Sequence, residues 1–241
     1  GMSILFISHD LSLVSEICNR VVVMYQGEIA EQGDVKTLFN NPQNSYTKAL
    51  IKSKPNIEVR FKKLPSVKNF IENTVSTEIY TDKERKDFHK KIYSQEPLLE
   101  LIDLEKHYLG AKKWWFQKDT FIKAVDKICF KIYQGETLGL VGESGCGKST
   151  LGRTLVHLEK ATSGSILYRG KDVTQLSRSN IKRLRKDIQI IFQDPFSSLN
   201  PRITVGEAIL EPMTVHSLYK NKTDRKNQVL LILEKVGLLP E

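Results

Sequence analysis

Residues 137–150 read TLGLVGESGCGKST, and the stretch GESGCGKS at 142–149 fits the pattern G-x-x-x-x-G-K-[ST]. The apolar run before this pattern predicts a buried strand, and the residues after it predict a helix. Glycines let successive N–H groups curl around an anion, and the start of a helix adds the positive end of its dipole. Lys148 can then reach the β- and γ-phosphates of a nucleotide, and the Ser149 hydroxyl can ligate Mg²⁺. The candidate nucleotide-binding residues are therefore Gly142, Glu143, Ser144, Gly145, Cys146, Gly147, Lys148, Ser149 and Thr150.

The composition favours a soluble globular protein with a core of its own, because 40% of the residues are hydrophobic and 27% are charged. No apolar run approaches the roughly 18 residues of a membrane-spanning helix, and no basic segment precedes Ile4–Ile7, so we expect no signal peptide. Cys18, Cys129 and Cys146 make no metal or disulfide spacing, which favours a reducing, cytoplasmic setting. The net charge of +9 admits a nucleotide, a nucleic acid or a membrane surface as partner without choosing among them.

Three regions differ in pattern. Residues 1–53 alternate strand and helix signals, residues 54–96 contain no glycine and resemble a linker with one helix near 82–92, and residues 97–241 have an α/β pattern. Strands are predicted at residues 4–7, 21–24, 28–31, 98–104, 128–132, 137–141, 165–168 and 188–192. Helices are predicted after Asp10 and Asp34, after the glycine-rich loop, and near 46–52, 179–186, 205–211 and 223–236.

The loop and the run IQIIFQ at 188–193 together resemble the ATPase domains of ABC transporters. The resemblance implies that Gln193, delivered by a buried strand, contacts Mg²⁺ and the attacking water and relays the nucleotide state to membrane subunits. The alternative is an ordinary surface glutamine that follows a strand.

The same family places an aromatic residue against the adenine ring, and the resemblance assigns this role to Tyr108. Stacking needs a flat, polarisable face, so any aromatic residue could serve. An insert at 110–123, rich in basic and aromatic residues, lengthens the gap to Gly142, so core packing of Tyr108 stays open as an alternative. The insert itself is expected to be a loop on the family fold, although a contact with nucleic acid or a membrane surface is conceivable.

The segment ILFISHD at 4–10 is similar to the family's switch segment, which implies that His9 contacts the γ-phosphate. The runs RVVVM at 20–24 and GEIAEQG at 27–33 continue the similarity, and a purely structural histidine is the alternative. In one such domain the switch histidine follows the phosphate loop, whereas His9 precedes Lys148 by 139 positions. We therefore expect residues 1–53 to end a first ATPase domain, residues 97–241 to begin a second, and residues 54–96 to link the two.

The stretches NPQNSYTKAL at 41–50 and QDPFSSLNP at 193–201 resemble the ATPases of dipeptide and oligopeptide importers. These occur in pairs or fused head to tail, so the resemblance implies the middle segment of a fused pair. The implied fold is that of the P-loop NTPases, as found in ABC ATPases: α/β, incomplete here, with mixed and antiparallel β segments. The implied cofactors are ATP and Mg²⁺. The implied partners are transmembrane permease subunits and a second ATPase domain or subunit, at a cytoplasmic location on the inner face of the cell membrane.

Two features of catalysis in the family are missing from this sequence, namely a Ser-Gly-Gly signature and an Asp-Glu pair at the end of an apolar strand. The resemblance implies that the glutamate of that pair activates the attacking water, and such general-base help is worth roughly 10²–10⁴ in rate. We therefore expect nucleotide binding with poor hydrolysis, with Lys148, Gln193 and His9 as the catalytic candidates. One alternative is a non-hydrolysing module that docks on a membrane subunit. Nucleic-acid binding, which only the charge and the insert suggest, is not expected.

Overall fold

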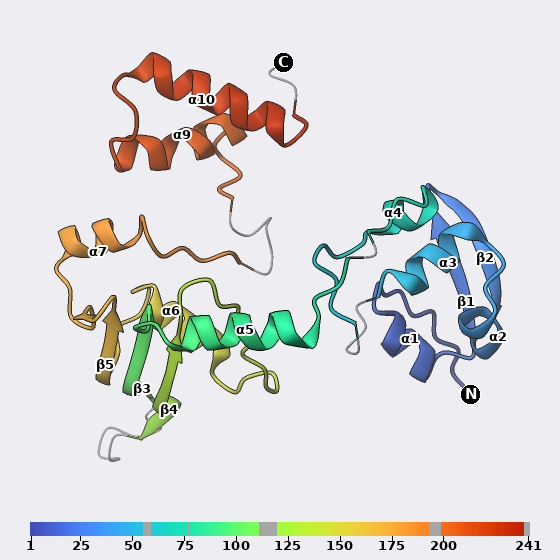
Figure 1. Cartoon of the computed structure of the whole chain (residues 1–241), viewed down its shortest axis with the longest axis horizontal. Helices are drawn as coiled ribbons and strands as arrows, with labels where there is room; N and C mark the ends of the chain where they lie inside the picture. The colour runs from blue at the N-terminus through green and yellow to red at the C-terminus, as the bar shows by residue number, and fades with distance from the viewer. Residues whose placement is uncertain (55–58, 77, 111–119, 193–198, 239–241) are drawn as a thin grey trace. The chain divides into compact units, whose positions relative to one another are not determined.

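The computed structural model describes residues 1–54, 59–76, 78–110, 120–192 and 199–238 (Figure 1). The chain divides into two compact units, Gly1–Lys90 and Lys91–Glu241, and each is described by itself. Within the described ranges, no helix combines the length and the apolar character needed to cross a bilayer.

The first unit is built from short helices and one β-hairpin. Its elements are α1 (Leu11–Ile17), β1 (Arg20–Tyr25), β2 (Glu28–Asp34), α2 (Val35–Asn40), α3 (Ser45–Lys52), α4 (Val67–Ile71) and most of α5 (Asp82–Tyr93). The Asp10 carboxylate accepts hydrogen bonds from the N–H groups of Ser12 and Leu13, and Asp34 accepts one from Thr37. Both residues therefore cap helices, as the sequence predicts.

The hairpin of β1 and β2 positions the core of this unit. Gln26 and Gly27 both have positive φ angles, 51° and 87°, which suits a two-residue turn between twisted antiparallel strands. Val21 and Val23 lie two positions apart and point to the same side of β1. Their buried cluster consists of Val14, Val21, Val23, Val35 and Leu38.

The expected linker at 54–96 contains more regular structure than its sequence pattern predicts. Helix α5 confirms the one predicted helix, but the short helix α4 was not expected. Its start is stabilised by a reciprocal pair of hydrogen bonds between Ser66 and Asn69. This is a capping box with asparagine in place of the usual Glu or Gln, which weakens the signal in the sequence.

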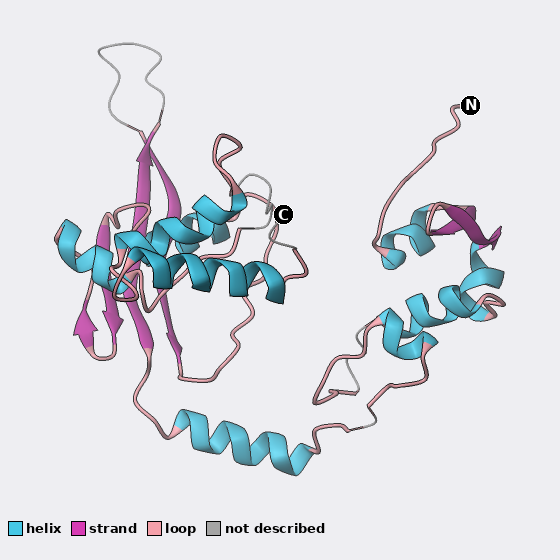
Figure 2. Cartoon of the chain, turned by 90° about the horizontal axis from the view of Figure 1, so that it is seen from above, coloured by secondary structure: helices cyan, strands magenta, loops and turns pink. Residues whose placement is uncertain are grey.

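The second unit contains an antiparallel sheet in the order β4-β3-β5-β6, whose strands are magenta in Figure 2. The strands are β3 (Leu99–Leu109), β4 (Phe121–Ile132), β5 (Ser163–Tyr168) and β6 (Lys171–Asp172). Leu101 on β3 faces Phe130 on β4 and Ile166 on β5. The buried core that forms here consists of Leu101, Leu104, Val125, Leu151, Ile166, Val173 and Leu184. The end of the predicted insert, residues 121–123, belongs to β4 rather than to a loop.

The helices of the second unit lie where the sequence predicts them. They are α6 (Lys148–Leu155), α7 (Arg178–Leu184), α9 (Val205–Val215) and α10 (Lys222–Lys235). Helix α6 follows the glycine-rich loop directly and packs on the sheet through Leu151, so the loop is attached to the core of this unit.

Three predicted strands are wrong. Residues 4–7, 137–141 and 188–192 lie in the described ranges but form no strand. Their side chains are largely exposed, for example 88% at Leu5, 89% at Val141 and 97% at Ile191. A strand requires a hydrogen-bonded neighbour, and the described residues provide none for these runs.

Candidate functional site

The glycine-rich loop ends at Gly147, which is the N-cap of α6 and has a φ angle of 96°. Gly147 has no side chain to cap the helix, and no side-chain hydrogen bond is made at this position. The first N–H groups of α6 therefore stay available to an external acceptor, and the helix dipole favours an anion there.

Lys148 lies across the loop and bonds to its backbone. The Nζ atom donates to the carbonyl oxygens of Gly142 and Glu143, each at 2.7 Å, and lies 3.3 Å from the Sγ atom of Cys146. These contacts hold the ammonium group against the backbone of the glycine-rich loop. Phosphate oxygens are stronger, charged acceptors that can take the place of the two carbonyls.

The room around the ammonium group depends on Gly142. A Cβ atom at this position would come 2.8 Å from the Cys146 sulfur and 3.9 Å from the Lys148 Nζ. The missing side chain therefore leaves room for the Cys146 sulfur and for the close curl of the loop backbone.

Cys146 is an exposed thiol within the loop. Its hydrogen bond with the Lys148 ammonium lowers the pKa of the thiol. A larger fraction of Cys146 is consequently present as thiolate at neutral pH than for an ordinary exposed cysteine, and the thiolate is the reactive form. This thiol and a bound phosphate would compete for the same ammonium group.

The predicted magnesium ligand, Ser149, lies in the first turn of α6 and is exposed. A hydroxyl at this place suits Mg²⁺, which keeps several waters and takes oxygen ligands from the protein and from phosphates. The neighbouring Thr150 is half-buried and lies next to the other predicted site residue of this unit, Tyr108.

Tyr108 lies near the end of β3, opposite Ile122 of β4. Its hydroxyl group donates a hydrogen bond to the Glu159 carboxylate, which raises the pKa of Tyr108. Tyr108 is half-buried and does not belong to the hydrophobic core cluster of the unit. The structure therefore brings this aromatic ring next to the helix that carries the phosphate loop.

The other two predicted site residues are not brought to the loop by the described structure. His9 is exposed and belongs to the first unit, where the run before it forms no strand. Gln193 lies outside the described residues. Both assignments stay predictions.

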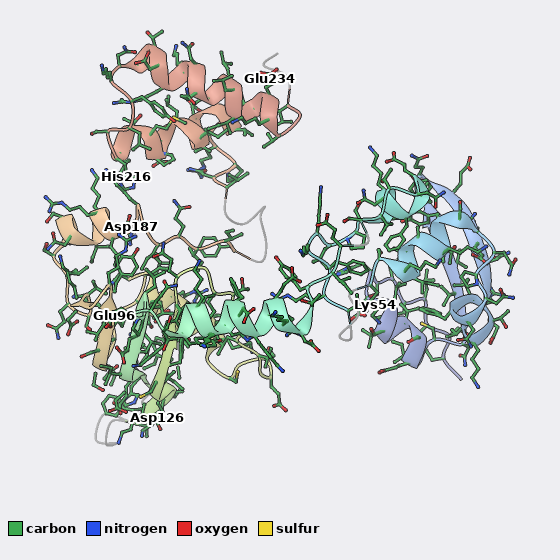
Figure 3. All side chains as sticks on the ribbon, in the orientation of Figure 1. Lys54, Glu96, Asp126, Asp187, His216 and Glu234 are labelled. Atoms are coloured by element: carbon green, nitrogen blue, oxygen red, sulfur yellow. The ribbon has the colours of Figure 1, made fainter. Side chains whose placement is uncertain are left out.

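One further group of side chains has the composition of a metal site. Ligand atoms of Glu105, His107 and Asp126 lie within 4.8 Å of one another, and Figure 3 labels Asp126 on the sheet. However, Lys123 already bonds both oxygens of Asp126 at 3.2 Å, and the Ser163 hydroxyl donates to Glu105 at 2.6 Å. The two carboxylates are therefore satisfied by protein groups, and we assign no ion to this place.

The sequence alone does not predict the contact that Glu159 makes with a site residue. Glu159 lies in the turn after α6 and contacts Tyr108, although 51 positions separate the two residues in the chain. A glutamate in a polar turn has no pattern of its own, so only the fold reveals this pairing.

Known proteins are similar in sequence to this chain over its whole length. Residues 125–240 match the ABC transporter family. The whole chain is 41% identical to the glutathione import ATP-binding protein GsiA of Shigella boydii serotype 4 (strain Sb227), and 40% identical to the protein of the same name from Escherichia coli (strain K12). In both cases the chain spans 38% of the length of the relative.

Solved structures of ATP-binding cassettes also align with the chain. A dimeric, post-hydrolysis structure of the cassette MJ0796 bound to ADP and Pi aligns over 59% of this chain and 58% of its own, with 22% identity and a TM-score of 0.48. CbiO1 from Clostridium perfringens aligns over 60% of this chain and 52% of its own, with 26% identity and a TM-score of 0.43.

Proposed function

We propose that the chain is an ATP-binding part of an ABC-type importer for a peptide-type solute. The observation that carries the proposal is the loop at 142–149, where the Lys148 ammonium bonds the loop backbone and α6 begins without a side-chain cap. The match of residues 125–240 supports ATP as the nucleotide. The name of the relatives supports import, since glutathione is itself a small peptide.

In this proposal the residues of the loop bind and orient the triphosphate. The N–H groups at the start of α6 hold phosphate oxygens, and Lys148 exchanges its bonds to the Gly142 and Glu143 carbonyls for bonds to the β- and γ-phosphates. Ser149 would hold Mg²⁺, which when bound neutralises charge on the phosphate oxygens. The ring of Tyr108 would stack on adenine.

The remaining roles rest on the family resemblance. We propose that residues 1–53 and 97–241 belong to two successive ATPase domains joined by residues 54–96. We also propose that His9 contacts the γ-phosphate, and that Gln193 would contact Mg²⁺ and the attacking water. We further propose transmembrane permease subunits and a second ATPase domain as partners, at the cytoplasmic face of the membrane. The chain spans 38% of the length of its relatives.

A second candidate function is a module that binds nucleotide without hydrolysing it and docks on a membrane subunit. It is favoured by the absence of a Ser-Gly-Gly signature and of an Asp-Glu pair from the sequence. Capture of a permease subunit in the presence of ATP, with no turnover, would support this function over that of an ATPase.

Isothermal titration with ATP and Mg²⁺ tests the shared premise of both functions. We expect binding by the native chain and a loss of at least about tenfold in Lys148→Ala, because charge-assisted bonds to the phosphates are removed. Lys131→Ala is a matched control, since this lysine bonds Glu100 at 2.9 Å on the sheet and not the loop. Equal binding by the native and Lys148→Ala proteins would refute the proposal, as would no binding at millimolar ATP by a folded protein.

A further inference from the structure

The Glu159 carboxylate is the centre of a small polar cluster next to the phosphate loop. One of its oxygens accepts the hydrogen bond from the Tyr108 hydroxyl and lies 3.8 Å from the Lys106 ammonium. The other oxygen lies 3.8 Å from the Arg153 guanidinium. The Glu159 side chain is 20% exposed and that of Lys106 is 16% exposed, so this pair is partly removed from water. In such surroundings polar groups interact more strongly than they do on an open surface.

The cluster joins two elements that differ in sequence and in role. Lys106 and Tyr108 belong to β3, whereas Arg153 belongs to α6, whose first residue is Lys148. The backbone N–H groups of Leu158 and Glu159 bond the Arg153 carbonyl, at 2.9 and 3.3 Å, which fixes the turn that carries Glu159 against the end of α6. Through Glu159, the ring of Tyr108 is tied to the same helix that holds the phosphate loop.

Lys106 restricts the ring further. Its Nζ atom lies 4.8 Å from the centre of the Tyr108 ring, in a cation–π arrangement. This ammonium group lies over one face of the ring, and the hydrogen bond to Glu159 fixes the direction of the hydroxyl group. A flat ligand that stacks on Tyr108 would therefore use the opposite face, whose orientation the contact with Glu159 holds in the free protein.

We propose that Glu159 is a positioning residue for the nucleotide base, which holds the Tyr108 ring in the orientation that stacks on adenine while the loop holds the phosphates. This inference rests on the proposed function and adds to it a residue that touches neither the base nor the phosphates. Glu159 affects the binding of the base and not the binding of the phosphates. The contribution of the loop to phosphate binding is independent of it.

Two ligands separate base binding from phosphate binding, namely ATP and inorganic tripolyphosphate, each titrated calorimetrically with Mg²⁺. Stacking on an aromatic ring contributes roughly five- to hundredfold to affinity, so loss of its orientation in Glu159→Ala is expected to weaken ATP binding by about five- to tenfold. The affinity for tripolyphosphate is expected to stay within about twofold of the native value. Glu159→Gln, which keeps an oxygen acceptor for the Tyr108 hydroxyl, is expected to recover most of the loss.

Tyr108→Phe supplies an independent variant if Glu159→Ala does not fold, because it deletes only the hydroxyl and keeps the ring. Its effect on ATP is expected to match that of Glu159→Ala, and the double variant is expected to be no worse than either alone, as for two ends of one interaction. Glu105→Ala is the matched control: this carboxylate is also on β3 but accepts from the Ser163 hydroxyl rather than from tyrosine. It is expected to leave the affinity for both ligands unchanged.

The results distinguish failure of the positioning role of Glu159 from failure of the proposed function. If Glu159→Ala and Tyr108→Phe weaken both ligands equally, or weaken neither, the positioning role is refuted while the phosphate loop stands. The same conclusion follows if the native protein binds ATP no more tightly than tripolyphosphate. If the folded native protein binds neither ligand, the proposed function itself fails and the positioning role fails with it.

Discussion

Gly147 occupies the point where the loop becomes helix α6, and two independent constraints require glycine there. Its φ angle of 96° is strained for any residue with a Cβ atom, and an added Cβ would lie 2.0 Å from the Ala124 carbonyl oxygen. We predict that Gly147→Ala lowers the free energy of unfolding by at least about 1–3 kcal/mol. It should also weaken ATP binding, because the loop must move away from the Ala124 carbonyl of β4. Urea denaturation followed by ATP titration measures both effects.

Gly152 offers a matched control within the same helix. A Cβ atom added there has no neighbour within 4 Å, and its backbone is helical. We expect Gly152→Ala to be neutral or to stabilise by up to about 1 kcal/mol, since alanine is the better helix former. Similar destabilisation by both substitutions would show that the effect at Gly147 is not specific to its conformation.

The sequence is sufficient to locate the residues proposed to bind phosphate but not those proposed to orient the base. The spacing of Gly142, Gly147 and Lys148 is a local pattern, and local patterns translate directly into backbone geometry. The pairing of Tyr108 with Glu159 joins β3 to the turn after α6, and no local pattern encodes such a distant contact. The sequence therefore predicts the geometry of neighbouring residues such as those of the loop, but not a contact between distant residues.

At the scale of elements, predictions succeed where an element is stabilised by its near neighbours. The hairpin of β1 and β2, and helices α6, α7, α9 and α10, depend on turns, caps and adjacent residues, and they form as expected. The apolar runs at 137–141 and 188–192 predict buried strands, but a strand is completed only by a partner that its own sequence does not specify. Among the described residues these runs have no such partner, and their side chains are therefore largely exposed.

Helix α5 should depend on pH through the residues at its start. The N–H group and hydroxyl of Thr81 bond the Glu84 carboxylate, and the Lys62 ammonium lies 3.0 Å from it. The hydrogen bond from the Thr81 backbone, followed by the one from Lys62, lowers the pKa of Glu84 to about 2. Because the pKa is lowered on folding, the stabilisation is complete above the ordinary value of 4.5 and is lost as the pH falls toward 2.

We therefore predict that amide exchange in residues 82–93 accelerates between about pH 4.5 and pH 2, beyond the intrinsic pH effect on exchange. Glu84→Gln should show faster exchange in α5 already at pH 7 and little further acceleration across this range. Glu72→Gln, in an exposed pair with Lys68 at 3.7 Å, should leave α5 unchanged. A native profile that matches that of Glu84→Gln would contradict the role of this carboxylate.

At the scale of the whole molecule, each unit has its own buried core and its own part of the proposed machinery. The unit Lys91–Glu241 holds the phosphate loop and Tyr108, whereas the unit Gly1–Lys90 holds His9. In the proposed function, triphosphate binding needs only the unit Lys91–Glu241, because the loop residues all belong to it. Hydrolysis in the family needs groups that the 241 residues do not contain, so binding and turnover should separate in this chain.

We predict that the isolated chain binds ATP but releases phosphate at a rate lower by about 10²–10⁴ than an ABC ATPase that has the Asp-Glu pair, since it lacks that general base. A phosphate-release assay at saturating ATP measures the rate, and the Lys148→Ala protein, purified in parallel, reports the contribution of contaminating ATPases. Activity equal in both proteins is background and agrees with the prediction. Turnover near that of an intact transporter ATPase, abolished by Lys148→Ala, would require another residue of this chain to activate the water and would overturn the argument from the missing glutamate.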